Sequence, residues 1–409
     1  MAQIQKYSLR LARNAVYLEK QTLLASSAAT QTCNYSSNPR IIKDSNTAAL
    51  KRGTGGRSSF NGSVCTVFGA SGFLGRYVCN QLGKIGTQLI IPFRGDHYNV
   101  MQLKLCGDLG QVLYSPFHLC DEESILKAIK YSNVVVNLIG CDWETKNFKF
   151  NDVNVEGPAR LARLAKQSGV ERFIHVSCLN VTANEPPKFL KTGSRFLKSK
   201  LAGEEAVKKE FPEATIVRPS DIYGQEDKFL RQYGTKFRVH LRGIPLWEKG
   251  EKTEKQPVAV YDVAAGIAAL VKDPNTAGKT YQFVGPKRYK LSELVDWFCG
   301  FLRYESKKYG YRRLDIKRFP LFYLKLELCS ALSPSYPAGL LHWEGIEKEH
   351  ISDVVLKDLP TLEDLGIQLT EMENQVPWEM KIYKIDGTYD ADLGEFDPPP
   401  FPKTVPLPY

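Results

Sequence analysis

The sequence lacks several features that would indicate particular classes of protein. No apolar run reaches the roughly 18–20 uncharged residues of a membrane-spanning helix. The nine cysteines are an odd number without a C-x-x-C pair, and several stand inside apolar runs. We therefore expect buried, reduced cysteines and no metal ligands, in preference to disulfides or a zinc site. No helix-turn-helix pattern or basic motif with interleaved aromatics is present, which argues against a nucleic-acid partner.

The composition that remains is typical of a globular protein. The chain has 409 residues, of which 43% are hydrophobic and 24% charged. This length can bury the core of one large domain or of two. The formal charge of +10 is compatible with an anionic membrane, an acidic partner, or a basic targeting segment beside an ordinary solvated surface.

The N-terminal region has the composition of a targeting sequence. In residues 1–44 the only acid before Asp44 is Glu19, and serines and threonines are frequent. Basic residues alternate there with leucines and valine, at Lys6, Arg10, Arg13 and Lys20. This pattern indicates a mitochondrial presequence, with a basic arm that stays attached as the alternative. Residues 45–62, rich in Gly, Ser, Lys and Arg, are expected to form a linker or extended arm.

A glycine-rich turn between a strand and a helix is the clearest motif. The apolar, β-branched run 64–68 predicts a buried strand, and an amphipathic helix pattern begins near Leu74. Between them Gly69 permits a sharp turn, Gly72 lets backbone N–H groups approach a pyrophosphate, and Gly75 permits close helix packing. We therefore predict a dinucleotide site. Its expected residues in this turn are Gly69, Ala70, Ser71, Gly72, Phe73, Leu74 and Gly75.

Strand and helix patterns alternate after this turn. Further strands are expected at 88–93, 111–119, 133–139, 172–177 and 214–217, and helices at 122–131, 155–168 and 198–210. This alternation predicts an α/β fold, a Rossmann-type doubly wound parallel sheet. We assign residues 63–290 to this domain, which includes the start of a smaller C-terminal lobe, and 291–370 to the rest of the lobe. Residues 371–409 are expected to form an extended, proline-rich tail.

The end of the second strand indicates which dinucleotide binds. Arg94 stands nineteen positions beyond Gly75, where an NAD site usually has an acidic residue that accepts from the ribose 2′-OH. An arginine cannot accept that hydrogen bond but can pair with a 2′-phosphate. Arg76 is a second candidate for this contact. We predict NADP(H) in preference to NAD(H), the alternative being that both arginines are only solvated.

Later segments resemble the extended short-chain dehydrogenase/reductase family. Asn137-Leu138-Ile139-Gly140 ends the fourth strand, Ser177 ends the fifth, and Phe196-Leu-Lys-Ser-Lys200 follows. The segments 216–224, which contains Pro219 and Ile222, and 258–263 match as well. The resemblance implies a serine that binds a substrate carbonyl, a proton-donating tyrosine and a lysine that binds the nicotinamide ribose. It implies that the cofactor-binding residues include Asn137, Leu138, Ile139, Gly140, Ser177, Lys200, Pro219 and Ile222.

The departures from the family pattern concern the catalytic set and the adenine contact. Phe196 stands where the family has its tyrosine, and a phenyl ring has no proton to give. We therefore expect no catalytic residue, while Lys200 can still hold the ribose. His118 stands where an aspartate usually contacts the adenine, with Asp121 three positions later.

Two other residues near these motifs are not assigned catalytic roles. His175 is expected to be a packed strand residue, and Tyr223 belongs to a different strand end from the catalytic set.

A narrower resemblance connects the chain with the dehydrogenase-like accessory subunits of mitochondrial respiratory complex I. It covers about 52–370 and is carried by the segments 72–78, 90–94, 107–112, 142–148, 211–224 and 362–368. It implies a subunit peripheral to the inner membrane, on the matrix-side arm near the ubiquinone-binding region. It also implies other complex I subunits as partners and NADPH that is held tightly and not turned over. A free mitochondrial NADPH-dependent reductase or epimerase is the alternative; a chaperone-like or RNA-associated role has only the net charge in its favour.

The segment 305–341 combines a basic stretch with an apolar, aromatic one. Six basic residues between Lys307 and Arg318 precede the run 319–332. Such a segment can lie on an anionic inner-membrane surface or in a groove of a partner protein. A helix packed on its own domain with a solvated basic edge explains the pattern equally well.

Overall fold

The fold described here is that of a computed structural model. The structure describes residues 51–182, 186–235, 237–240, 243–302, 311–332, 341–384 and 398–407, without the side chain of Leu332. The expected presequence at 1–44 and the first part of the expected linker lie outside the described residues. Contacts within the chain group residues 45–409 into one compact unit.

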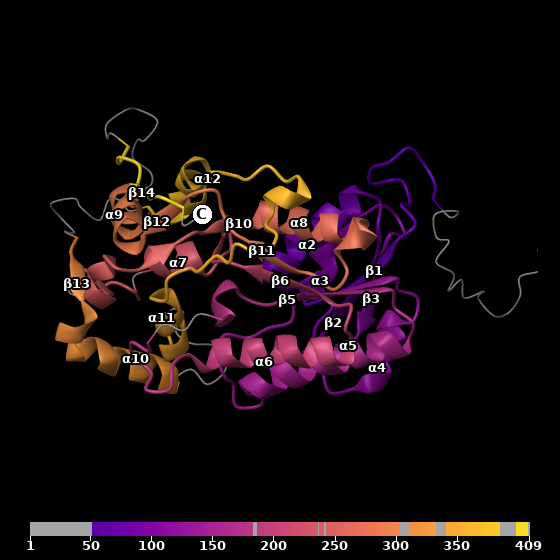
Figure 1. The fold of residues 1–409 in the computed structure, drawn as a ribbon, viewed down its shortest axis with the longest axis horizontal. Coiled ribbons are helices and arrows are strands. Elements are labelled where there is room, and N and C mark those ends of the chain that lie inside the picture. The colour runs from indigo at the N-terminus through magenta and orange to yellow at the C-terminus, as the bar shows by residue number, and fades with distance from the viewer. Residues whose placement is uncertain are drawn as a thin grey trace, which may run out of the picture. The chain divides into compact units, whose positions relative to one another are not determined.

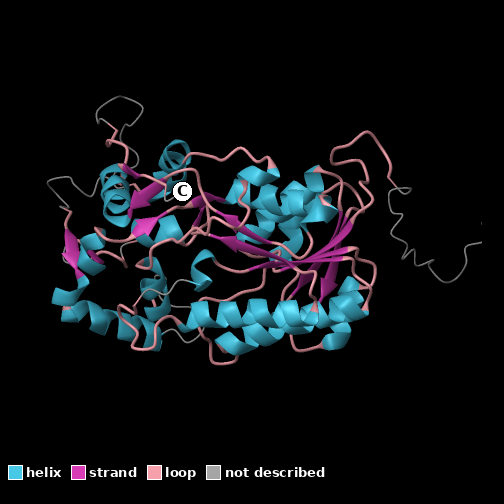
Figure 2. Cartoon of the chain, viewed as in Figure 1, coloured by secondary structure: helices cyan, strands magenta, loops and turns pink. Residues whose placement is uncertain are grey.

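A parallel sheet of seven strands forms the centre of this unit (Figures 1 and 2). Its order is β11-β6-β5-β4-β1-β2-β3. The strands are β1 (Val64–Phe68), β2 (Gln88–Phe93), β3 (Val112–Pro116), β4 (Val134–Asn137), β5 (Arg172–Val176), β6 (Thr215–Pro219) and β11 (Thr280–Phe283). The chain runs outward from β1 through β2 to β3, then returns to β4 on the other side of β1. The strand order therefore reverses between β1 and β4, where ligands of such sheets bind.

Helices cover both faces of the sheet (Figure 1). One face carries α2 (Phe73–Lys84) and α8 (Val260–Lys272), with α3 (Tyr98–Met101) and η2 (Gln102–Cys106) nearby. The other carries α4 (Glu122–Ile129), α5 (Gly157–Gln167) and α6 (Arg195–Glu210). Each side has its own apolar cluster, one with Val78 and Ile267, the other with Leu161 and Val207. The predicted doubly wound Rossmann-type sheet is thereby confirmed.

The helix expected at 155–168 begins differently from the prediction. Asp152–Glu156 form a π-helical turn, named η3, from which α5 continues at Gly157. A Cβ atom on Gly203 of α6 would lie 2.0 Å from the Asn154 carbonyl oxygen. The turn and α6 therefore approach each other more closely than any side chain would permit. This contact holds Asn154, which is fully buried, beside α6.

The C-terminal lobe is built from short strands and helices around a second apolar core. That core includes Tyr233, Phe298 and Leu294. The strands are β7 (Ile222–Tyr223), β8 (Ile244–Leu246), β9 (Glu254–Lys255), β10 (Val258–Ala259), β12 (Arg288–Lys290), β13 (Arg313–Asp315) and β14 (Thr404–Val405). The helices are α7 (Phe229–Gly234), α9 (Leu291–Phe301), α10 (Pro320–Leu332), α11 (Trp343–Glu349) and α12 (Met372–Glu379). Short 3-10 turns are η4 (Leu179–Thr182), η5 (Trp247–Gly250), η6 (Pro274–Thr276), η7 (Ile316–Arg318), η9 (Glu363–Leu365) and η10 (Met380–Tyr383).

The expectation of an extended tail over 371–409 is wrong for its first part. Residues 372–383 form α12 and η10, and 404–405 pair with β12 in an antiparallel ladder. Met372, Val376 and Met380 are spaced by four, share one helix face and are at most 2% exposed. Their burial in the lobe core stabilises a helix that the polar composition of the segment does not predict.

Helix α10 has one packed face and one exposed face. Phe322, Leu326 and Cys329 join a small apolar cluster that includes Ile316 and Ile346. On the other side three leucines are more than half exposed, at Leu321, Leu324 and Leu328. Among the described residues, no helix combines the length and apolar character required to cross a bilayer.

Candidate functional site

The glycine turn after β1 has the backbone conformation that the motif predicts. Gly69 has φ +83°, and a Cβ atom there would lie 3.1 Å from the carbonyl carbon of Leu138 at the end of β4. A Cβ atom on Gly75 would lie 2.5 Å from the Gly69 carbonyl oxygen. Both positions therefore exclude larger residues, and the turn brings α2 close against β1.

The N-terminus of α2 is open toward an anion. Its N-cap residue is Gly72, whose N–H donates to the Gly69 carbonyl at 3.1 Å. The first turn contains no acidic residue, and no side chain caps it within the described chain. Free N–H groups and the positive end of the helix dipole remain available, as a pyrophosphate requires.

A pocket of about 430 Å³ adjoins this turn where a 2′-phosphate would lie. It is lined by Ser71, Arg76 and Arg94 together with Tyr98, Asn99, Val100 and Gln102. Arg76 is engaged in an exposed ion pair with Glu226. Arg94 stacks over the Phe148 ring at 5.8 Å and forms no ion pair with a described residue. Of the two predicted arginines, Arg94 is therefore the one with its charge available.

The segment after β4 is held by its own side chain and by β1. The Leu138 N–H donates to the Phe68 carbonyl at 3.0 Å, and the Ile139 N–H donates to Asn137 Oδ1 at 3.0 Å. Asn137 Nδ2 lies 3.1 Å from His175 Nδ1, and both side chains are fully buried. Burial, followed by the charge of Lys200, lowers the pKa of His175 to about 3. His175 is thus a neutral packing residue, as predicted.

A cavity of about 310 Å³ contains the three positions of the family's catalytic set. Ser177, Phe196 and Lys200 line it, along with Phe73, Gly140, Pro219 and Ile222 from the predicted site. Ser177 Oγ is buried without a hydrogen-bond partner among the described residues. Lys200 Nζ donates to the Val176 carbonyl at 3.4 Å, and burial lowers its pKa. A Cβ atom on Gly140 would lie 2.6 Å from Lys200 Nζ, so the ammonium and this strand end touch.

Neither Phe196 nor Tyr223 supplies a proton to this cavity. Phe196 is 7% exposed and packs edge-on against Phe150, with 6.2 Å between ring centroids. The Tyr223 hydroxyl is directed elsewhere and donates to the Thr370 carbonyl at 3.2 Å. Burial, with nearby carboxylates such as Asp262, raises the pKa of Tyr223 far above its usual range. Tyr223 therefore does not replace the missing tyrosine.

The two candidates for the adenine contact have different surroundings. Asp121 caps α4, because its Oδ1 accepts from the Glu123 N–H at 3.1 Å. His118 is exposed, and its Nδ1 accepts from the Cys120 N–H at 3.3 Å. The aspartate therefore has a structural role, and the exposed imidazole is left as the group able to meet a base.

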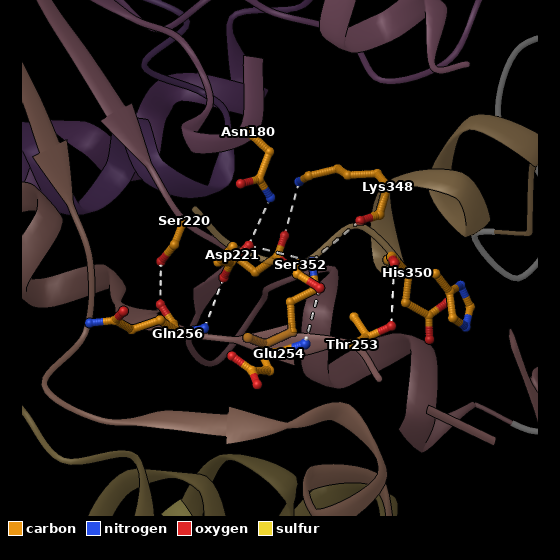
Figure 3. A network of polar contacts seen from close by, with 12 residues as sticks. Asn180, Ser220, Asp221, Thr253, Glu254, Gln256, Lys348, His350 and Ser352 are labelled. Atoms are coloured by element: carbon orange, nitrogen blue, oxygen red, sulfur yellow. Dashed lines mark hydrogen bonds and ion pairs between the residues drawn. The ribbon is translucent and has the colours of Figure 1, made fainter. Parts of the chain in front are cut away.

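Asp221 and Lys348, which line the cavity, belong to a network of polar and charged side chains (Figure 3). Asp221 Oδ2 accepts from Lys255 Nζ and Asp221 Oδ1 from Lys348 Nζ, each at 3.0 Å. Asp353 accepts from Asn180 Nδ2 at 2.8 Å and lies 3.6 Å from Lys255 Nζ. Burial alone would raise the pKa of Asp221, but the two ammonium groups hold it well below its usual range.

This network joins the lobe to the Rossmann domain. Lys348 is on α11, whereas Asp221 lies between β6 and β7 (Figure 3). The neighbouring Glu349 pairs with Arg238 at 2.7 Å, where both side chains are at most 2% exposed. Helix α11 is thereby fixed against the cavity by one buried ion pair, Arg238–Glu349, and one partly exposed pair, Asp221–Lys348. Gly345 on the same helix also lines the cavity.

Several of these residues were not found from the sequence. Asp221 lies in the segment 216–224 that resembles the family, so the sequence could have pointed to it. Its partner Lys348 is 127 positions further along the chain and lies in no such segment. Asn154 holds the segment that follows β4 against α6, because its Oδ1 accepts from the Cys141 N–H at 3.2 Å and its Nδ2 donates to Ser199 Oγ at 3.0 Å. Asp142 and Lys228 form an ion pair of 2.7 Å at the cavity.

The arrangement fits a dinucleotide and gives no indication of a metal. The open N-terminus of α2, the uncompensated Arg94 and the unpartnered Ser177 Oγ are donors placed along the edge where the strand order reverses. Lys200 is the group able to hold a ribose. No cluster of three or more histidine, cysteine, aspartate or glutamate side chains suited to a metal occurs among the described residues.

Comparison with protein families and solved structures agrees with this geometry. A model of the NAD dependent epimerase/dehydratase family matches residues 65–284. The fold is similar to the structure of dTDP-glucose 4,6-dehydratase DesIV from Streptomyces venezuelae, with a TM-score of 0.58 and 16% identity. That similarity covers 78% of this chain and 96% of the dehydratase chain, and it concerns the fold alone.

Two mitochondrial proteins are similar over most of the chain. NADH dehydrogenase (ubiquinone) 1 alpha subcomplex subunit 9 of Mus musculus is 48% identical over 330 residues, which is 80% of this chain and 82% of that protein. The NADH-ubiquinone oxidoreductase 40 kDa subunit of Neurospora crassa is 36% identical over 342 residues, with shares of 83% and 84%. The chain therefore belongs to the NAD-dependent epimerase/dehydratase family and, within it, to the family of mitochondrial proteins that these two subunits represent.

Proposed function

We propose that this chain is an accessory subunit of mitochondrial respiratory complex I that binds NADP(H) tightly and does not turn it over. The relatives from mouse and Neurospora carry names of such subunits. The proposal includes a position on the matrix side of the inner membrane, in contact with other subunits of the complex.

The observation that carries the non-catalytic part is the environment of Phe196. Its ring occupies the cavity beside Ser177 and Lys200, at the place of the family's proton donor. A phenyl group cannot protonate a substrate oxygen, and Tyr223 has its hydroxyl bound to a backbone carbonyl. The residues that would hold a ribose and a nicotinamide remain, so binding is retained while proton transfer is not.

The preference for NADP(H) depends on Arg94. Its guanidinium lines the pocket next to Ser71 and is free of carboxylates among the described residues. An arginine forms charge-assisted, bidentate hydrogen bonds with a phosphate, whereas it cannot accept the hydrogen bond that the 2′-OH of NAD(H) donates. Arg76 is less suited, because it is already paired with Glu226.

A retained cofactor stabilises the folded chain without any reaction. A ligand that binds only the native state adds roughly 3–4 kcal/mol when its concentration is a hundred to a thousand times its Kd. The crevice contacts the ends of β1, β4 and β5 and adjoins α11, so this stabilisation reaches both the sheet and the lobe.

The exposed face of α10 is proposed to rest on the anionic surface of the membrane. Leu321, Leu324 and Leu328 form an apolar stripe of positions i, i+3 and i+7. Two basic residues of the expected segment, Arg313 and Lys317, have carboxylate partners, because Arg313 pairs with Asp296 at 3.1 Å and Lys317 with Glu248 at 2.9 Å. Residues 305–310 and 333–340 of that segment lie outside the described residues. Burial of the leucines is the attraction that we test.

The experiment that tests the proposal uses the native chain from solubilised mitochondria. Assemblies are separated by size, this chain is located, and the nucleotide released on denaturation is identified. We expect NADP(H) from a chain inside a very large respiratory assembly. A small species with exchangeable cofactor would contradict the proposal.

That contrary result would favour the second candidate, a free NADPH-dependent reductase or epimerase. One observation supports it: Ser177 Oγ has no hydrogen-bond partner among the described residues and lines, with Lys200, a cavity of about 310 Å³. Such an enzyme would need a proton donor other than Phe196.

A further inference from the structure

A second, larger concavity lies at the opposite edge of the sheet from the dinucleotide crevice. It has a volume of about 650 Å³ and is bounded by the loop 51–56 and by the ends of α2 and α8. The beginnings of β1, β4 and β5 form its floor. Because the strands are parallel, these beginnings lie at the edge away from Gly69 and Ser177.

The charge of this concavity is strongly positive. Its basic residues are Lys51, Arg52, Lys84, Arg172 and Lys272, and its single carboxylate is Glu171. Burial lowers the pKa of Arg172, and the carboxylate of Asp273, which lies outside the lining, opposes that shift. None of the four exposed cations forms an ion pair with a described residue. The C-termini of α2 and α8 carry partial charges of about −0.5 each, which do not offset this excess.

Arg172 provides a fixed donor at the floor. It is 9% exposed, and its guanidinium donates to the Val271 carbonyl at 3.0 Å and to Thr276 Oγ1 at 2.7 Å. Its Nε is buried without a hydrogen-bond partner among the described residues. An arginine held in this way retains its charge and loses little conformational freedom when it meets an anion.

The loop above the floor is anchored but leaves its backbone accessible. Arg52 and Phe60 exchange backbone hydrogen bonds of 3.0 and 2.9 Å, and the Asn61 N–H donates to the Gly86 carbonyl at 3.1 Å. Between these anchors Gly55 and Gly56 have φ of +106° and +90°, and Cβ atoms there would meet nothing within 4 Å. An anion can therefore approach the glycine backbone closely.

We propose that this concavity binds a phosphate-bearing ligand, distinct from the dinucleotide at the other edge. Its volume is in the range of small-ligand pockets, and its donors are those that diphosphates and phospholipid headgroups share. An isolated basic concavity also concentrates anions by focusing its field. The proposal does not depend on the role of the chain in complex I.

The test measures anion binding to the full chain in the presence of saturating NADPH, which blocks the crevice. One probe is inorganic pyrophosphate, measured by calorimetry. The other is co-sedimentation with phosphatidylcholine vesicles that contain cardiolipin, compared with phosphatidylcholine alone. Every protein used with the vesicles carries Leu324→Glu and Leu328→Glu, so that the apolar stripe of α10 does not contribute. The variant K51Q/K272Q removes two exposed charges from the concavity. K127Q/K166Q removes two exposed lysines from α4 and α5 and serves as the matched control.

We expect K51Q/K272Q to weaken binding of at least one probe by at least about tenfold, and the control to leave it unchanged. Pyrophosphate binding would identify a soluble ligand, and binding of cardiolipin vesicles alone a lipid headgroup. Arg52→Gln should reproduce the loss, as a second variant independent of the two lysines. Absence of binding to both probes, equal losses in the control, or loss only in Arg94→Glu would overturn the proposal.

Discussion

Phe196 and Lys200 lie one helical turn apart on α6, and both side chains line the cavity into which the unpartnered Ser177 hydroxyl is buried. The lysine that we propose to bind the ribose thus lies beside a ring that has no exchangeable proton. This arrangement is expected to retain cofactor binding without proton donation, two functions that the family usually combines in one site.

Phe196→Tyr tests that separation. We expect nucleotide retention and assembly to be unchanged, with the free energy of unfolding altered by no more than about 1 kcal/mol, because the change adds only a hydroxyl. NADPH consumption with a carbonyl compound should become detectable, since Ser177 and Lys200 are in place. Phe196→Leu is the control without a hydroxyl. Loss of the nucleotide in the tyrosine variant would contradict this view of the site.

Arg94→Glu tests the preference for NADP(H). A carboxylate against a 2′-phosphate replaces attraction by repulsion, so NADPH affinity should fall by about tenfold to a hundredfold. NADH affinity should change far less, and Lys127→Glu on α4 should change neither. Titration with both nucleotides measures this. Unaltered NADPH retention would show that Arg94 does not meet the phosphate.

The exposed leucines of α10 can be changed without disturbing its packed face. Leu324→Glu with Leu328→Glu should abolish most binding of the chain to cardiolipin-containing vesicles, because the apolar stripe is lost. Leu109→Glu makes the same chemical change at a side chain that is 95% exposed on the Rossmann domain, and it is expected to have no effect. Equal binding by all three proteins would refute the membrane contact.

Glu349→Ala should be strongly destabilising. It leaves the Arg238 charge buried without its partner, which costs about 3–5 kcal/mol. Glu122→Ala breaks the exposed pair with Arg163 and should cost less than about 1 kcal/mol. Urea unfolding of the two variants compares them. A similar loss of unfolding free energy in both variants would show that the buried pair contributes no more to stability than the exposed one.

Glu379→Gln should change how stability depends on pH. Burial raises the pKa of Glu379 in the folded chain to about 7, above its ordinary value near 4.5. The folded state therefore binds the proton more tightly, and stability is lost as the pH rises from about 4.5 through 7. Glutamine removes this loss, so the variant should gain stability over the parent at pH 8 relative to pH 5. Glu123→Gln, an exposed change on α4, should show no such trend.

The Rossmann-type sheet and the glycine-rich turn after β1 could be predicted from the sequence. Gly69 is required by its positive φ and Gly75 by its close contact with Gly69 and Ala70, so their spacing is a local signal. Alternating apolar strands and amphipathic helices leave a doubly wound sheet as their common solution. The phenylalanine in the place of the family's tyrosine was also visible at position 196, because the motif that contains it is continuous in the chain.

Only the tertiary structure shows which charged side chains near the site are already in ion pairs, and how the C-terminal lobe is attached to the sheet. Arg76 is paired with Glu226, 150 positions away, and Asp221 is held by lysines from β9 and α11. Residues 372–383 become helical because Met372, Val376 and Met380 enter a core made by distant segments. Such pairings depend on contacts between residues far apart in the chain, and no local pattern of residue types specifies them.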